Sequence, residues 1–306
     1  MPQTWLIVGA TRGIGLEFTS QLLSLGYIVL ATARAPATTP SVHSGNASNL
    51  WSLTGTPNGH NLTILECDVS DEASIKDFTE RIRKLGRKGC VLEKGIIDVM
   101  VLNAGVMEYP NRISEISFQA FSHHLNTNTI GPLLTASSLL TLSSLPPLTL
   151  PSVPPNPDVP LSPFLPSVPI NIHTLVFMSS DSGSTALFRS HEDGFGAYAA
   201  SKAALNQGLR HLAAELQRKG VRDGSKAPVV LAIHPGEVAT DMAANVNFEW
   251  EVEGIISPEE SVRCMLKVVG EKGWGGVDEG GNVSRQGRGE QGEAYFWTWE
   301  GRRYPW

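Results

Sequence analysis

Tyr198 and Lys202 are the residues whose types and spacing most directly suggest chemistry in this sequence. They stand four positions apart in the run YAASK, so they share one face if the segment is helical. Apolar residues continue at helical spacing and predict such a helix: Leu205, Leu209, Leu212, Ala213 and Leu216. A phenol titrates near pH ~10, and a neighbouring ammonium lowers its pKa. The pair therefore fits a general acid/base, although it also fits the exposed face of an amphipathic helix.

A glycine-rich turn near the start of the chain has the pattern of a phosphate-binding loop. An apolar strand at 5–8 precedes it, and a helix with Phe18 and Leu22 on one face follows. Glycines let the backbone approach a pyrophosphate, and a helix N-terminus supplies N–H groups and positive dipole. The residues expected to contact the cofactor here are Gly9, Thr11, Arg12, Gly13, Ile14 and Gly15. The alternative is an ordinary turn between a strand and a helix.

Two arginines favour NADP(H) over NAD(H) as the cofactor. Folds that prefer NAD usually place an acidic residue after the second strand to hold the ribose 2′-hydroxyl. No acidic residue lies between Glu17 and Glu66. Instead, Arg34 follows the strand at 27–32, and Arg12 lies in the glycine-rich turn. Both are placed to meet a 2′-phosphate, and the alternative is two solvated arginines.

Two further strands end in residues suited to the surface of a bound nucleotide. The strand at 63–67 is followed by Asp68 and Val69, and Asp68 either bonds the adenine amine or caps the next helix. The continuous apolar strand at 96–102 ends in Asn103, Ala104 and Gly105. Open α/β sheets bind ligands at the carboxyl ends of their strands, so we expect these residues to contact the cofactor.

Strands and helices alternate along the chain, which predicts the α/β class with a single doubly wound Rossmann domain over 1–306. Further strands are expected at 173–178, 229–233 and 294–298, giving a mainly seven-stranded parallel sheet with helices on both faces. Three segments depart from this alternation: a Pro-rich surface insertion at 141–171, a substrate loop at 242–257 and a Gly-rich loop at 270–293. A long helix at 118–140 should kink, because Pro132 removes a helical N–H bond.

In order, VGATRGIG, NAG and YAASK make the chain resemble the short-chain dehydrogenase/reductase family over nearly its whole length. The longer loop before Tyr198, with SKAALN and HPG, is similar to the carbonyl-reductase-like branch that includes C-factor and sniffer proteins. The resemblance implies Tyr198 as the acid/base, Lys202 as the group that tunes it, and Ser180, from the Ser-Ser-x-x-Gly pattern, as the residue that orients the carbonyl.

The resemblance also assigns roles beyond this trio. Asn128 would hold a bent helix and support a proton path, with Asn126 as the alternative if the register slips. Lys202 would hydrogen-bond the nicotinamide ribose, and Tyr198 would also contact the cofactor. The segment after the strand at 229–233 would contact the nicotinamide through Pro235, Gly236, Val238 and Thr240. Relatives dimerise through the helices that bear Asn128 and Tyr198, so a homo-oligomer, a dimer or tetramer, is expected.

Composition argues against nucleic acid, membrane and metal as further partners of the chain. The net charge of −6 argues against nucleic acid as a partner, and no apolar run is long enough for a membrane segment. Cys67, Cys90 and Cys264 form neither a zinc pattern nor a disulfide framework, so we expect no metal and a cytoplasmic protein.

The predicted function is hydride transfer between NADP(H) and a carbonyl or secondary alcohol. Phe248 and Trp250 in the expected substrate loop favour a small apolar or aromatic metabolite as the substrate. Two alternatives are a dehydratase or epimerase that tailors a biosynthetic product on the same fold, and a regulator that binds NADP without catalysis. The presence of Ser180, Tyr198 and Lys202 together argues against the regulator, since a pure sensor needs no acid/base pair.

Overall fold

The computed structural model describes residues 2–34, 47–144, 167–190, 192–244, 254–277 and 294–306. Its centre is a seven-stranded sheet in the order β3-β2-β1-β4-β5-β6-β7, and every neighbouring pair runs parallel. The strands are β1 (Thr4–Val8), β2 (Ile28–Ala33), β3 (Leu62–Glu66), β4 (Ile96–Leu102), β5 (Asn171–Met178), β6 (Val229–His234) and β7 (Tyr295–Thr298). The predicted doubly wound α/β fold is therefore confirmed.

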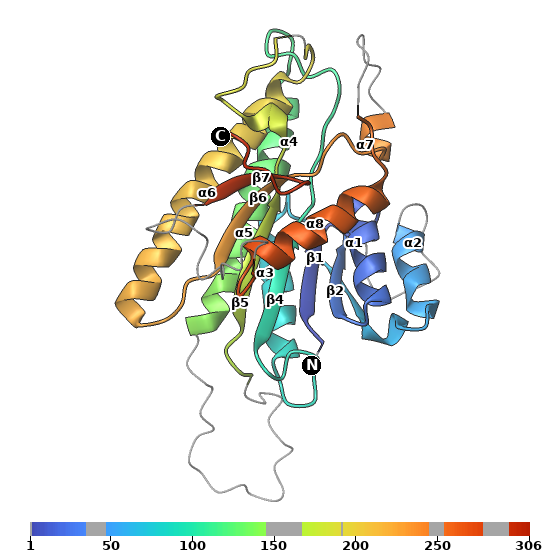
Figure 1. The fold of residues 1–306 in the computed structure, drawn as a ribbon, viewed down its shortest axis with the longest axis vertical. Helices are drawn as coiled ribbons and strands as arrows, with labels where there is room; N and C mark the ends of the chain where they lie inside the picture. Colours follow the sequence, from blue (N-terminus) through green and yellow to red (C-terminus); the bar gives the residue numbers. More distant parts are fainter. Residues whose placement is uncertain (1, 35–46, 145–166, 191, 245–253, 278–293) are drawn as a thin grey trace, which may run out of the picture.

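Helices cover both faces of the sheet (Figure 1). They are α1 (Gly13–Ser24), α2 (Ala47–Ser52), α3 (Glu72–Leu85), α4 (Phe118–Leu125), α5 (Gly131–Leu140), α6 (Gly196–Asp223), α7 (Asp241–Ala244) and α8 (Pro258–Lys272). One apolar cluster joins α3, α5 and α6 to the sheet, and a second joins α1 and α8 to the opposite face. Burial on both faces explains why the central strands read as continuous apolar runs. No helix in the described segments has the length and apolar composition that crossing a membrane requires.

The strand order reverses between β1 and β4, and this switch places the ends of those strands around one crevice. Chain segments leave β1 and β4 in opposite directions, so the turn after β1 and the residues after β4 line the same opening. The helix that carries Asn126 and Asn128 passes beside this crevice. Between α4 and α5 that helix contains a π-helical turn, Asn126–Ile130, directly before Pro132. The expected interruption is thus present, as a π turn rather than a simple proline kink.

The boundaries of the three predicted irregular segments differ in part from the observed ones. Helix α8 continues to Lys272, so residues 270–272 are helical and the Gly-rich loop was predicted to begin too early. Met242 belongs to the short helix α7, and residues 141–144 form a 3₁₀ turn that continues α5. In α8 the buried Val268 and Val269, and in the 3₁₀ turn the buried Leu142, extend the helical structure past the point where local composition predicts its end, whereas α7 has no buried residue. Residues 145–166, 245–253 and 278–293, including Phe248 and Trp250, lie outside the described residues.

Candidate active site

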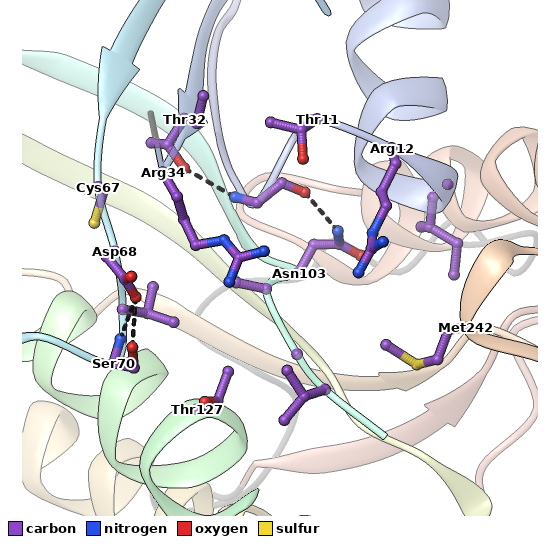
Figure 2. Close-up of a pocket in the computed structure, with 18 of the residues that line it drawn as sticks. Thr11, Arg12, Thr32, Arg34, Cys67, Asp68, Ser70, Asn103, Thr127 and Met242 are labelled. Atoms are coloured by element: carbon purple, nitrogen blue, oxygen red, sulfur yellow. Dashed lines mark hydrogen bonds between the residues drawn. The ribbon is translucent and has the colours of Figure 1, made fainter. Parts of the chain in front are cut away.

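A cavity of about 170 Å³ opens at the carboxyl ends of β1, β2, β3 and β4 (Figure 2). Most of the residues predicted to contact a cofactor line it: Gly9, Thr11, Arg12, Gly13, Ile14, Arg34, Asp68, Val69, Asn103, Ala104, Gly105 and Thr240. These residues follow β1, β2, β3 and β4, except Thr240, which lies in the segment after β6. The tertiary structure therefore brings the dispersed motifs of the predicted nucleotide site to one surface.

The glycine-rich turn is held as a cradle that side chains would fill. A Cβ on Gly9 would lie 2.7 Å from the Ala104 backbone, and one on Gly15 would lie 2.1 Å from the Gly9 carbonyl oxygen. The Gly9 amide donates to the Thr32 hydroxyl at 2.9 Å, and Asn103 donates to the Gly9 carbonyl at 2.8 Å. Because α1 begins with no side-chain cap and no acidic residue in its first turn, its N-terminus suits a phosphate. The residues present fit a dinucleotide.

Arg12 and Arg34 extend into this cavity from different elements, one from the turn before α1 and one from the end of β2 (Figure 2). Neither side chain forms a hydrogen bond or ion pair with another residue in the described segments. Two guanidinium groups that form no ion pair with a described residue favour an anionic ligand. Asp68 is instead engaged locally, accepting hydrogen bonds from the Ser70 amide at 2.9 Å and the Ser70 hydroxyl at 2.6 Å.

The cavity also contains residues that sequence reasoning did not select. They are Thr32, Ala33, Cys67, Ser70, Val106, His123, Thr127, Asp241 and Met242. Thr32 had a detectable signal, since a hydroxyl near the end of the second strand lies opposite the first glycine of the turn. The others come from elements whose approach to the cavity depends on packing, and Thr127 and Met242 carry no motif of their own.

Tyr198 lies near the start of α6, and a hydrogen bond joins its hydroxyl to Ser180. Ser180 follows β5, is 7% exposed, and also hydrogen bonds the Asp181 carboxylate at 3.1 Å. The 3₁₀ turn after β5 packs closely on α6, because a Cβ on Gly183 would lie 2.7 Å from the Lys202 Cβ. Two elements separated in sequence thus bring a phenol and a serine hydroxyl together, as a shared oxygen site requires.

Lys202 is buried on the same face of α6 as Tyr198. Its Nζ donates to the Met178 carbonyl at 2.8 Å and lies 5.8 Å from the centre of the Tyr198 ring. Burial lowers the pKa of Lys202 to about 8. Burial raises the pKa of the Tyr198 phenol, and the nearby carboxylates of Asp181 and Glu237 raise it further, so the net shift is opposite to the lowering that the sequence predicts. The contribution of the Lys202 charge itself stays a prediction.

Asn128 is fully buried in the π turn and lies near Lys202. Its side chain bonds both backbone groups of Val106, accepting from the amide at 2.8 Å and donating to the carbonyl at 2.8 Å, and it donates to the Ser201 hydroxyl at 3.0 Å. A Cβ on Gly105 would lie 3.2 Å from the Asn128 Oδ1 and 3.7 Å from the Lys202 Nζ. Asn128 and Lys202 therefore border one site beside the strand end that lines the cavity.

Six predicted contact residues lie outside the cavity wall: Tyr198 and Lys202, described above, and four others. Gly15 packs beneath the Gly9 carbonyl, and Gly236 packs beneath the Trp299 ring. Pro235 accepts a hydrogen bond from the Ser261 hydroxyl at 2.6 Å, and Val238 is 7% exposed in a bridge to Ile256. These residues support the loop that leads to Thr240, which does line the cavity.

An ionic cluster beside Ser180 was not anticipated from the sequence. Arg189 pairs with both Asp181, at 2.7 Å, and Glu192, while His234 accepts from the Asp181 amide at 3.3 Å. Ligand atoms of Asp181, His234 and Glu237 lie within 4.8 Å of one another, as a metal site would require. However, the Arg189 guanidinium already supplies positive charge there. Burial and the Asp181 charge raise the pKa of Glu237 to about 7, and burial lowers the pKa of His234.

The family model described as short chain dehydrogenase matches residues 3–143 and 174–250. An uncharacterized oxidoreductase of Schizosaccharomyces pombe is 30% identical over 278 residues, which cover 87% of this chain and 89% of that protein.

Two solved structures are similar over nearly their whole lengths. The NADPH-bound carbonyl reductase from chicken fatty liver has a TM-score of 0.69 at 26% identity, covering 100% of this chain and 99% of that one. The carbonyl reductase Sniffer of Drosophila melanogaster has a TM-score of 0.66 at 22% identity, covering 100% of both chains. The fold resemblance to the sniffer-type branch, expected from the sequence, is confirmed.

Proposed function

The chain belongs to the short-chain dehydrogenase family, and we propose that this oxidoreductase transfers hydride between NADP(H) and a carbonyl or secondary alcohol. One observation carries the proposal. Tyr198, Ser180, Lys202 and Asn128 come together from three elements, and Asn128 and Lys202 border Gly105 in the wall of the cavity. That cavity contains a glycine cradle and two arginines that have no partner among the described residues.

We assign NADP(H) as the cofactor. When bound, it would supply or accept the hydride at the nicotinamide. The amides at the start of α1 would hold the pyrophosphate, and Arg12 and Arg34 would hold the 2′-phosphate. The NADPH-bound carbonyl reductase from chicken, with which this chain shares the fold at 26% identity, supports the assignment.

Tyr198 is proposed as the proton donor in the reductive direction. Its raised pKa keeps the phenol protonated throughout the neutral range, which is the form a general acid needs. Ser180, already bonded to that phenol, would donate to the same substrate oxygen and orient it. Lys202 would place a positive charge near the phenolate that forms, and its charge disappears as the pH rises through about 8. Asn128 would hold the backbone at Val106 beside this group.

The surroundings of Tyr198 support a small apolar or aromatic substrate. The Phe195 ring lies 6.3 Å from the Tyr198 ring, and the Tyr109 ring lies 5.3 Å from that of Phe195. The carboxylates of Asp181, Glu192 and Glu237 outnumber the Arg189 charge, so they disfavour an anionic substrate. A single domain, a homo-oligomeric assembly and a cytoplasmic location are part of the same proposal.

The test is NADPH oxidation by the full-length protein with a panel of aldehydes, ketones and quinones. Tyr198→Phe removes the proton donor and keeps the ring, so we expect kcat to fall by about 10²- to 10⁴-fold. Fluorescence titration should show an NADPH Kd within about threefold of the parent, since the cofactor cavity is unchanged.

Tyr295→Phe is the matched control, because this tyrosine lies on β7 and removal of its hydroxyl leaves the proposed site intact. Its kcat should match that of the parent. Turnover by Tyr198→Phe at the parental rate would disprove the assigned mechanism.

A further inference from the structure

Helix α6 carries Tyr198 and Lys202, yet its own sequence offers no cap for its first turn. The helix begins at Gly196, and the preceding residue, Phe195, has no side-chain acceptor. The first backbone N–H groups of a helix lack partners within the helix and need an outside acceptor. The first turn of α6 contains no acidic residue either. The stability of this turn matters because Tyr198 is its third residue.

Asn111, distant in the sequence, supplies the missing acceptor. Its Oδ1 accepts from the Ala197 amide at 2.8 Å and from the Tyr198 amide at 3.0 Å. These are the second and third residues of the helix, the positions that an N-cap side chain normally bonds. Its backbone carbonyl also accepts from Ala197 at 3.1 Å. Asn111 thus performs the role of an N-cap for a helix in which it does not reside.

The Asn111 side chain is itself fixed. It is 3% exposed, its Nδ2 donates to the Glu108 carbonyl, and its amide donates to the Gly194 carbonyl at 2.7 Å. Next to it, the Arg112 side chain binds the Asp193 carboxylate through Nε at 2.7 Å. These contacts join the segment after β4 to the segment directly before α6, so the cap has little freedom to move.

The same segment is tied to Asn128. Val106 is bonded on both backbone groups by the Asn128 side chain, and the Glu108 amide donates to the buried His124 ring at 3.2 Å. A continuous set of hydrogen bonds therefore runs from the π turn, through residues 106–111, to the amide of Tyr198. The two halves of the proposed site, Asn128 and Tyr198, are held in register by this connection.

We propose that Asn111 is a positioning residue that fixes the location of the Tyr198 hydroxyl by capping α6 from outside the helix. The proposal rests on the proposed function of Tyr198. Helix ends fray when their caps are lost, and a displacement of about 1 Å at a reacting group can cost on the order of 10²-fold in rate. Asn111 is 3% exposed and does not line the cavity, so it would act through the backbone of α6.

The experiment compares Asn111→Ala, Asn111→Asp and Asp71→Ala in the full-length protein. Alanine at position 111 removes the cap, whereas aspartate keeps an acceptor oxygen at a helix N-terminus that favours negative charge. Asp71 caps α3 by accepting from the Ala73 amide at 3.0 Å, and α3 carries none of the proposed catalytic or cofactor-binding residues. Asp71→Ala therefore matches the loss of a cap without touching α6.

For Asn111→Ala we expect kcat to fall about tenfold or more, with the NADPH Kd within about twofold of the parent. Asn111→Asp should recover kcat to within about fivefold of the parent. Asp71→Ala should lower the melting temperature about as much as Asn111→Ala and leave kcat unchanged. The proposal is overturned if Asn111→Ala keeps kcat within twofold of the parent, or if aspartate restores no more activity than alanine.

Amide hydrogen exchange of residues 196–202 gives a readout that does not depend on turnover. Asn111→Ala should expose the Ala197 and Tyr198 amides to faster exchange, and Asp71→Ala should not. If the parent neither binds NADPH nor reduces any carbonyl, the proposed function fails, and exchange still decides whether Asn111 caps α6. Unchanged exchange in Asn111→Ala would refute the capping role.

Discussion

Arg34 is the residue on which the choice between NADP(H) and NAD(H) most depends. It follows the last residue of β2, the position where NAD-preferring folds place a carboxylate for the ribose hydroxyl. A carboxylate there would repel a 2′-phosphate, whereas a guanidinium binds it in a bidentate manner. The side chain already extends into the cavity, so little rearrangement is needed for binding (Figure 2).

We therefore expect Arg34→Ala to weaken NADPH binding by about 10- to 100-fold, the equivalent of one charge-assisted contact of roughly 1.5–3 kcal/mol. NADH binding should change little. Arg302→Ala is the control, since Arg302 is an exposed arginine that pairs with Glu300 away from the cavity. Titration of both cofactors measures the effect, and equal losses for NADPH and NADH would contradict the assigned contact.

The pKa values of Tyr198 and Lys202 shift in directions that their spacing does not predict. Spacing alone predicts that an ammonium four residues away acidifies the phenol. In the folded chain, burial raises the pKa of Tyr198 and lowers that of Lys202 to about 8, so the ammonium loses its proton before the phenol does, the reverse of the order that a close ammonium–phenolate pair would give. The phenol is then a proton donor at neutral pH, which suits the reductive direction.

Among the elements, the close contact between α6 and the 3₁₀ turn Asp181–Gly183 determines the distance from Ser180 to Tyr198. Asn206 on α6 strengthens the contact by accepting from the Ser179 hydroxyl at 2.6 Å and donating to the Gly183 carbonyl at 3.2 Å. Gly183 leaves no room for a side chain, because an added Cβ would lie 2.8 Å from the Lys202 carbonyl carbon.

Gly183→Ala should force the turn away from α6. We expect a loss of about 1–3 kcal/mol in the free energy of unfolding and a fall in kcat of about tenfold or more. Gly270→Ala is the matched control, since Gly270 is a helical glycine of α8 with no atom within 4 Å of an added Cβ. That variant should be neutral or slightly stabilised. Thermal unfolding and steady-state kinetics test both, and unimpaired kinetics in Gly183→Ala would refute this account.

Across the whole molecule, the proposed chemistry and the residues that flank the Pro-rich tract are at opposite ends of the sheet. The described flanking residues lie at the amino-terminal edge of the sheet: Ser167 bridges Arg87, and Asn171 begins β5 opposite Ile96 at the start of β4. The cavity lies at the carboxyl ends of the strands. The length of the strands therefore separates these flanking residues from the cavity.

Replacing residues 146–166 by a short Gly/Ser linker should consequently spare turnover. We expect kcat and the NADPH Kd to stay within about threefold of the parent, because none of the described site residues contacts the flanks of the tract. Circular dichroism establishes that the variant is folded. A collapse of kcat in a variant that retains its fold would show that the tract contributes to catalysis.

The sequence by itself determined the architecture and the identity of the principal groups. Strand–turn–helix periodicity predicted the parallel sheet, because a buried strand reads as an apolar run whatever its neighbours. The motifs around Gly9, Asn103 and Tyr198 identified three places, each at the end of a strand or helix, where residues suited to cofactor binding or catalysis occur. Such signals are local, since each depends on residues within a few positions of one another.

Only the tertiary structure decided how those groups are held and how they titrate. The direction of the Tyr198 pKa depends on burial and on carboxylates from other loops, and the ion pairs of Arg189 arise from packing. The cap that Asn111 provides joins residues 86 and 87 positions apart, which no periodicity can reveal. The physical reason is that desolvation and hydrogen-bond geometry are properties of contacts between distant segments, and these exist only once the chain is folded.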